Sequence, residues 1–189
     1  MNINKWLLYN SAALVAVFTF GAAAFSLEYS ISWLHNVFNL STGARLGVLL
    51  LFGLMCFPGV LVGSLLTGAA FVGSGEGINF GLIEELVEAF SVLIALLMMQ
   101  HFKLGNFYTK ESFYFPHVLF LCILTSFLSA TGRLIVLVQF DEIERFFNFS
   151  EYIGSILLGN LLGTVVFFTL AIFIMHAFNQ YFEQHSSNH

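Results

Sequence analysis

Residues 43–72 read GARLGVLLLFGLMCFPGVLVGSLLTGAAFV, an apolar run that is interrupted at Phe57-Pro58-Gly59. Proline is tolerated in the first turn of a helix, and the residue before it is pushed out of the helical region. The run therefore predicts two helices, 43–56 and 58–72, joined by a tight Pro-Gly turn. Each would hold about 14–15 residues, fewer than the roughly 20 that cross a bilayer. Tilted spans, spans extended by flanking residues and a re-entrant hairpin all remain open.

The whole chain shares the apolar character of this run. Of its 189 residues 58% are hydrophobic, 17% aromatic and 9% charged, whereas soluble domains carry about 25% charged residues. Backbone groups in lipid must be satisfied internally, and continuous apolar runs indicate helices rather than strands. The sequence predicts an all-α, polytopic transmembrane helical bundle of about six membrane segments, at 6–27, 43–56, 58–72, 80–101, 116–138 and 151–180.

The domain organisation follows from these segments. We expect a single integral membrane domain over 1–189, with its core at 6–180 and a polar tail at 181–189. The first run is 22 residues long, more than the about 7–15 of a signal-peptide core, so it is interpreted as a retained helix.

The cationic residues predict the orientation of the bundle. Six passes place Lys5, Lys103 and Lys110 on one side, whereas Arg145 lies on the other side among acidic residues. Because cytoplasmic loops carry the excess of Lys and Arg, both termini are expected in the cytoplasm.

Composition and motifs exclude several functions. A net charge of −5 with six Lys and Arg leaves no basic surface for nucleic acid. The histidines are scattered without the spacing of a helical zinc site, and Cys56 and Cys122 lie inside apolar runs. No nucleophile or phosphate-loop motif is present. We therefore expect no catalytic residue, no metal and no cofactor.

Three carboxylates begin the segment at 80–101. Glu84 and Glu88 are one helical turn apart and share a face, so that one of them can hold a proton. Glu84 and Glu85 also suit the water interface, since they fall in the first turns. Glu88 is deeper, and an ionisable residue at that depth is a functional candidate by default.

Two arginines and one amide are the other polar candidates. Arg45 begins one segment and Arg133 lies about 17 residues into another, so each either snorkels to the interface or pairs with a carboxylate or an anionic ligand. Asn160 is expected to hydrogen-bond across helices. We predict that Glu88 lies inside the bundle and that Arg133 or Arg45 faces the same polar cavity, where a ligand or signal is read.

Small residues at four-residue spacing mark close helix packing. Such positions let helices approach one another in lipid, either inside the bundle or between two copies of the chain. The positions are Gly59, Gly63, Ser155, Gly159 and Gly163.

Four stretches in this order resemble the first family of MASE domains, the membrane-associated sensor domains of bacterial signalling proteins. They are GARLGVLLLFGLMCFPGVLVGSLLTG (43–68), GLIEELVEAFSVLIALLMMQHF (81–102), LTSFLSATGRLIVL (124–137) and YIGSILLGNLLGTVVFFTL (152–170). Glu88 takes the place of that family's helix glutamate. The chain departs from the pattern in having Asn160 where Asp is usual, Thr169 where Pro is frequent, and Ser41-Thr42 where the family has Pro-Pro.

The resemblance implies a sensor of the bacterial inner membrane that feeds a cytoplasmic histidine kinase, diguanylate cyclase or phosphodiesterase. Only a short tail follows residue 180, so we expect either a stand-alone module acting through a separate protein partner or a fragment. The primary hypothesis is a non-enzymatic sensor or ligand-binding module. The alternatives are the substrate-binding membrane subunit of a small-molecule uptake transporter, because broken helices often flank binding sites, and a structural subunit of a membrane complex.

Overall fold

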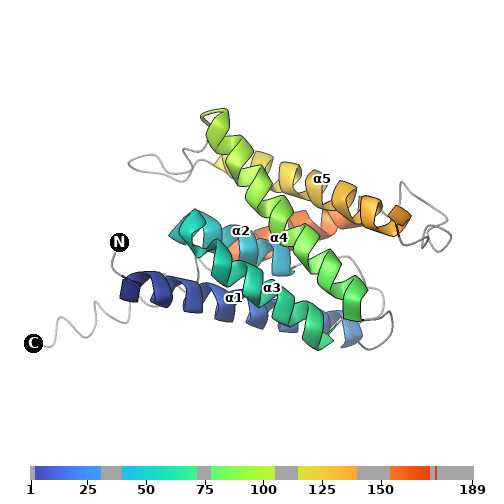
Figure 1. The fold of residues 1–189 in the computed structure, drawn as a ribbon. Helices are drawn as coiled ribbons and strands as arrows, with labels where there is room; N and C mark the ends of the chain where they lie inside the picture. The colour runs from blue at the N-terminus through green and yellow to red at the C-terminus, as the bar shows by residue number, and fades with distance from the viewer. Residues whose placement is uncertain are drawn as a thin grey trace, which may run out of the picture.

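The chain is described here from a computed structural model, which describes residues 3–30, 40–71, 78–104, 115–139, 154–170 and 173. Lys110, Arg145, the polar tail 181–189 and most of the predicted last segment beyond 170 lie outside these residues. The regular elements of the described part are all helical, which confirms the all-α bundle (Figure 1). They are α1 (Ile3–Ser30), α2 (Leu40–Phe52), the short 3-10 turn η2 (Leu54–Cys56), α3 (Phe57–Phe71), α4 (Ile78–His101), α5 (Phe115–Gln139) and a last helix over Gly154–Leu170.

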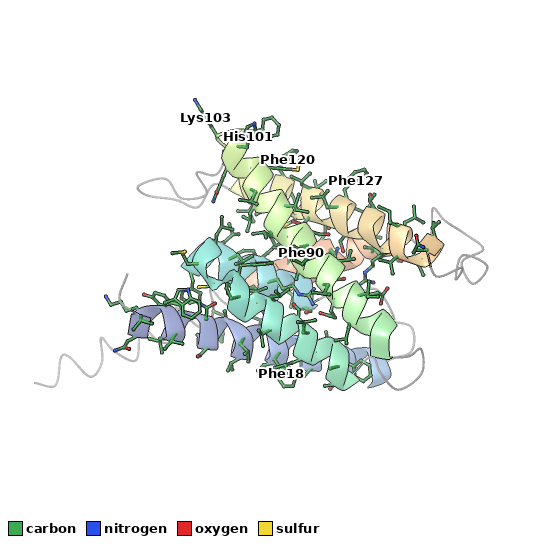
Figure 2. All side chains as sticks on the ribbon, viewed as in Figure 1. Phe18, Phe90, His101, Lys103, Phe120 and Phe127 are labelled. Carbon is green, nitrogen blue, oxygen red and sulfur yellow. The ribbon has the colours of Figure 1, made fainter. Side chains whose placement is uncertain are left out.

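Two of these helices are long and apolar enough to cross a membrane, at Ile3–Ser26 and Pro116–Gln139. Large apolar side chains also cover the outside of the bundle. Phe90, Phe120 and Phe127 expose 44%, 49% and 60% of their surfaces, and Figure 2 shows Phe120 and Phe127 on the outer side of the bundle. Because a water-soluble surface would not gather such side chains on several helices, the exposed faces suit lipid.

The α2–α3 hairpin is confirmed, although the chain reverses earlier than Phe57-Pro58-Gly59. Gly53 adopts φ +82°, a conformation that costs glycine little, and the η2 turn follows it. Phe57 is already helical, with φ −54° and ψ −40°. Pro58 therefore lies in the first turn of α3, where its missing N–H needs no helical partner. α2 and α3 hold 13 and 15 residues, so each is shorter than a full span.

Helices α1 and α3 lie side by side and run in the same direction. The added Cβ of an alanine at Gly59 would meet the backbone of Asn10, and one at Gly63 would meet the backbone of Leu14. The four-residue spacing is thus the same on both helices. Gly21 continues this contact line on α1, since its position faces Thr67 of α3. These small residues let the two helices approach closely.

The remaining helices alternate in direction. α4 runs antiparallel to α3, because Gly68 meets Glu85 near one end and Phe57 meets Phe90 nearer the other. α5 returns antiparallel to α4. The last helix runs parallel to α2, since Gly43 faces Gly163 and Gly47 faces Phe167.

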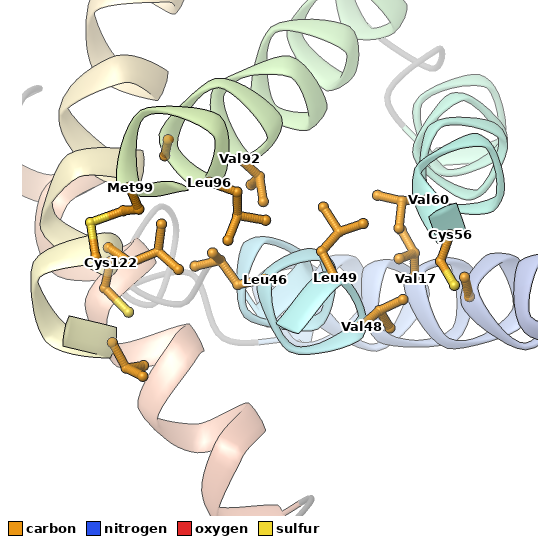
Figure 3. Close-up of a cluster of buried hydrophobic side chains, with 14 residues drawn as sticks. Val17, Leu46, Val48, Leu49, Cys56, Val60, Val92, Leu96, Met99 and Cys122 are labelled. Atoms are coloured by element: carbon orange, nitrogen blue, oxygen red, sulfur yellow. The ribbon is translucent and has the colours of Figure 1, made fainter. Parts of the chain in front are cut away.

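α2 is the central helix of the bundle. All nine positions from 41 to 49 are buried, whichever side of the helix they occupy. Figure 3 shows Leu46 directed toward Leu96, and Val48 beside Val17. Residues 41–49 are thus enclosed and have no contact with lipid or water, whereas Leu51 and Phe52 at the end of α2 are 43% and 44% exposed. A charged side chain on the enclosed stretch must therefore find its partners inside the protein.

Candidate functional site

Arg45 is the charged residue that α2 places in the centre of the bundle. Its relative exposure is 0%, so the guanidinium cannot reach an interface. Its Nε donates a hydrogen bond to Ser64 Oγ on α3 at 2.8 Å. Its two terminal nitrogens bind separate carboxylates on α4, Nη1 to Glu88 and Nη2 to Glu85. The guanidinium thus uses its planar fork to join three helices.

Glu88 is the carboxylate on which the two arginines converge. It lies eleventh in the 24 residues of α4 and is 1% exposed. One oxygen, Oε2, accepts hydrogen bonds from Arg45 and, at 3.1 Å, from Thr42 on α2. The other oxygen, Oε1, accepts a hydrogen bond from Arg133 on α5. A single carboxylate therefore links α2, α4 and α5.

Arg133 and Glu84 form the outer part of the same arrangement. Their side chains are 17% and 20% exposed, and Arg133 Nη1 lies 4.0 Å from Glu84 Oε1. We name Arg45, Glu84, Glu85, Glu88 and Arg133 the ion-pair cluster. Two guanidiniums face three carboxylates, so the cluster carries one excess negative charge when all are ionised. The partly exposed Glu84 is the carboxylate best placed to keep that charge hydrated.

The structure brings together four of the five polar candidates: Glu84, Glu88, Arg45 and Arg133. Both arginines pair with Glu88. The interpretation of Arg45 as a snorkelling residue is wrong, because α2 is enclosed on every side. That this cluster reads a ligand or signal stays a prediction.

Asn160 lies outside the ion-pair cluster. Its side chain is 1% exposed, yet its Nδ2 and Oδ1 atoms make no hydrogen bond within the described part of the chain. The expected hydrogen bond across helices is therefore not formed there. The last helix contacts α2 at Gly163 and Thr164 against Gly43, and at Phe167 against Gly47.

The predicted small residues pack inside the bundle. Gly59 and Gly63 face α1, and Gly163 faces α2. Gly159 is buried and Ser155 is half-buried on the same helix as Gly163. The three contacted glycines are thus occupied by other helices of the same chain and are not available to a second copy.

Several residues of the site were missed from the sequence. Glu85 is not among the predicted site residues, because its position also suits the interface, but it pairs with Arg45 and is 13% exposed. Thr42 and Ser64 also contact the cluster. Thr42 could have been found, since it lies three residues before Arg45 on one helical face. No sequence signal connects Ser64 with Arg45, because that contact depends on the hairpin.

A metal centre finds no support in the described residues. Among them no group of three or more His, Cys, Asp or Glu side chains is placed to hold a metal ion. The three glutamates instead face guanidiniums, and Cys56 and Cys122 are separate buried thiols. The chemistry available to the cluster is the exchange of ion pairs and hydrogen bonds between helices.

Comparison with known proteins agrees with this architecture. Neither a characterised protein nor a solved structure matches the chain. A family profile, MASE1, matches residues 8–189, nearly the whole chain. MASE1 is a family of membrane-associated sensor domains, which fits an apolar helical bundle with ion pairs in its core. The chain therefore belongs to the MASE1 family.

Proposed function

We propose that this chain is a non-enzymatic sensor module of the bacterial inner membrane that passes a conformational change to a separate protein partner. The observation that carries the proposal is the convergence of Arg45 and Arg133 on Glu88, which joins three helices through one buried carboxylate. The MASE1 family supports a sensory role. Its members signal to output domains, so a kinase or a cyclase is the partner class that we propose.

The ion-pair cluster has properties that suit a switch. Buried ion pairs contribute little net stability, because desolvation offsets their attraction, whereas breaking one of them is costly. A signal that draws Arg133 away from Glu88 would leave the buried Glu88 carboxylate with one cationic partner instead of two. The helices would then shift toward an arrangement that restores its partners. Because α2, α4 and α5 all contribute, such a change involves most of the bundle.

Co-purification tests the proposal. The tagged chain is extracted from its native membrane with mild detergent, and captured proteins are identified by mass spectrometry. We expect enrichment of a histidine kinase, diguanylate cyclase or phosphodiesterase over a control membrane protein. The partner's activity is then measured in membranes with the wild type and with Glu88→Gln. We expect capture to persist and the activity to change.

A matched control is Gln100→Ala, which alters an exposed residue on the same helix as Glu88. It should leave both capture and partner activity at wild-type values. Enrichment of none of these signalling enzymes, or equal partner activity with the wild type and Glu88→Gln, would contradict the proposal.

A transport component is the second candidate. The observation that favours it is the α2–α3 hairpin, whose helices are about 20 and 22 Å long at ~1.5 Å per residue and meet at Gly53. Interrupted helices often surround substrate sites in transporters. Uptake of a small molecule into liposomes that hold this chain and an energising partner would select this function over the sensor.

A further inference from the structure

The side-chain hydroxyls of Thr125 and Ser129 on α5 lack the hydrogen bond that the other two hydroxyls of this helix make. Ser126 and Thr131 each donate a hydrogen bond to the carbonyl four residues earlier, at 2.8 Å. This bond is the usual way for a hydroxyl to be satisfied on a helix in lipid. Thr125 and Ser129 are 0% and 1% exposed, and their oxygens make no hydrogen bond within the described residues. They occupy successive turns of one face, since they are four residues apart.

Asn160 on the last helix completes a set with these hydroxyls. The two helices meet where the side chains of Cys122 and Thr164 contact each other. α5 is antiparallel to α4, and α4 runs in the same direction as α2 and the last helix, so α5 and the last helix are antiparallel as well. Moving along α5 from Cys122 to Thr125 corresponds to moving back along the last helix from Thr164 to Asn160. Asn160 therefore lies on the side of the last helix that faces α5, displaced from Thr164 in the direction of Thr125.

The environment makes unsatisfied groups at this place unfavourable. No bulk water enters a helix interface inside a bilayer, so a buried amide or hydroxyl must find a partner in the protein, in an ordered water or in another bound molecule. Asn160 offers a donor and an acceptor side by side, and each hydroxyl can donate or accept. None of the three side chains is charged. Because burying a charge without a charged partner is costly, an uncharged molecule with a donor next to an acceptor suits these groups best.

We propose that Thr125, Ser129 and Asn160 form a binding site for a small uncharged molecule with an adjacent donor and acceptor, of the primary-amide type. An amide of the guest and the amide of Asn160 can form two parallel hydrogen bonds, while the hydroxyls bind its remaining donor and acceptor positions. Arg133 follows Ser129 by one turn on α5 and binds Glu88. The bound molecule thus lies beside the ion-pair cluster, and its action on the cluster rests on the proposed sensor function.

Thermal unfolding of the purified chain in detergent tests the site. Acetamide is the probe, and N,N-dimethylacetamide, which lacks a donor, is the matched comparison. By mass action, a ligand that binds only the folded state raises Tm as its concentration exceeds Kd. We expect acetamide to raise the Tm of the wild type in a saturable manner, and dimethylacetamide to require at least a tenfold higher concentration for the same shift.

The variants separate this site from general solvent effects. Asn160→Leu is expected to abolish the acetamide shift and Ser129→Ala to weaken apparent binding about tenfold. Thr169→Val is the control on the same helix, because that hydroxyl is exposed and donates to Val165 at 2.8 Å. It should behave as the wild type does. If Asn160→Leu does not fold, Ser129→Ala and Thr125→Val carry the comparison.

Two results would overturn the site. One is the absence of any saturable shift with acetamide, which is expected if the space is closed or holds only water. The other is an equal shift in the wild type and in the folded site variants. Both measurements use the isolated chain without a partner, so failure here leaves the co-purification experiment unaffected. Conversely, a failed co-purification leaves this binding measurement intact.

Discussion

Arg45 and Glu88 form an ion pair across α2 and α4 in which the side chains are 0% and 1% exposed. They are 43 residues apart in the chain. Glu88 also binds Arg133, so the removal of this one carboxylate affects two buried or half-buried cations. Arg45 also donates hydrogen bonds to Glu85 and to Ser64. The energetic consequences of this arrangement can be tested directly.

Glu88→Ala is expected to lower the free energy of unfolding by about 3–5 kcal/mol, because it leaves the guanidiniums without their shared carboxylate. Glu88→Gln keeps the side-chain volume and one acceptor oxygen, so the loss should be smaller. Unfolding of the purified chain by a graded increase in denaturing detergent measures both. Gln100→Ala, exposed on the same helix, should stay within about 0.5 kcal/mol of the wild type. Equal stability of wild type and Glu88→Ala would show that the cluster does not hold these helices together.

Gly59→Ala is expected to destabilise the bundle by about 1–3 kcal/mol through overpacking. The new Cβ would lie 2.2 Å from the backbone oxygen of Asn10, and backbone cannot move aside as a flexible side chain can. Gly154→Ala is the matched control, because no atom of the described residues lies within 4 Å of its added Cβ. That variant should be neutral or up to ~1 kcal/mol more stable, since alanine favours a helix over glycine. Similar unfolding curves for both variants would exclude the close α1–α3 contact.

Asn10→Leu is expected to lower the stability of the bundle by about 1–3 kcal/mol. Asn10 donates a hydrogen bond to the Met55 carbonyl at 3.1 Å and accepts one from the Gly59 N–H at 2.8 Å. Both backbone groups would lose their partner at the tip of the α2–α3 hairpin. Thermal unfolding in detergent measures the effect, and Ser11→Ala on the exposed side of α1 is the control. A stability equal to that of the control would mean that other groups satisfy the hairpin tip.

Lys5 and Lys103 should be accessible from the same side of the membrane. The alternating directions place the beginning of α1 and the end of α4 at the same side of the bundle, and the positive-inside rule assigns that side to the cytoplasm. Single cysteines at these positions, with Cys56 and Cys122 replaced by alanine, can be labelled with a membrane-impermeant reagent. We expect both to react only after the membrane is opened. Reaction of one position alone from outside intact cells would refute the shared orientation.

Much of the fold could be predicted from the sequence because lipid imposes simple rules. Continuous apolar runs must be helices, and the runs at 6–27, 80–101 and 116–138 correspond to α1, α4 and α5. The α2–α3 hairpin was also predicted, but its reversal was placed at Pro58 instead of Gly53. Proline and glycine both signal interruptions, and only the backbone conformation shows that Gly53 takes the positive φ while Pro58 begins a helix.

The sequence by itself identified Glu88, Arg45 and Arg133 as charges inside membrane segments, where charge is costly, but it left open whether the arginines snorkel to the interface or pair. Only the tertiary structure decided which partners they have. Helical spacing places Glu85 and Glu84 near Glu88 on one face, but it cannot show that α2 is enclosed on all sides. That enclosure arises from helices distant in sequence. It is the physical reason why Arg45 pairs with Glu85 and Glu88 instead of reaching the interface, and why Asn160 is buried yet lies apart from the cluster.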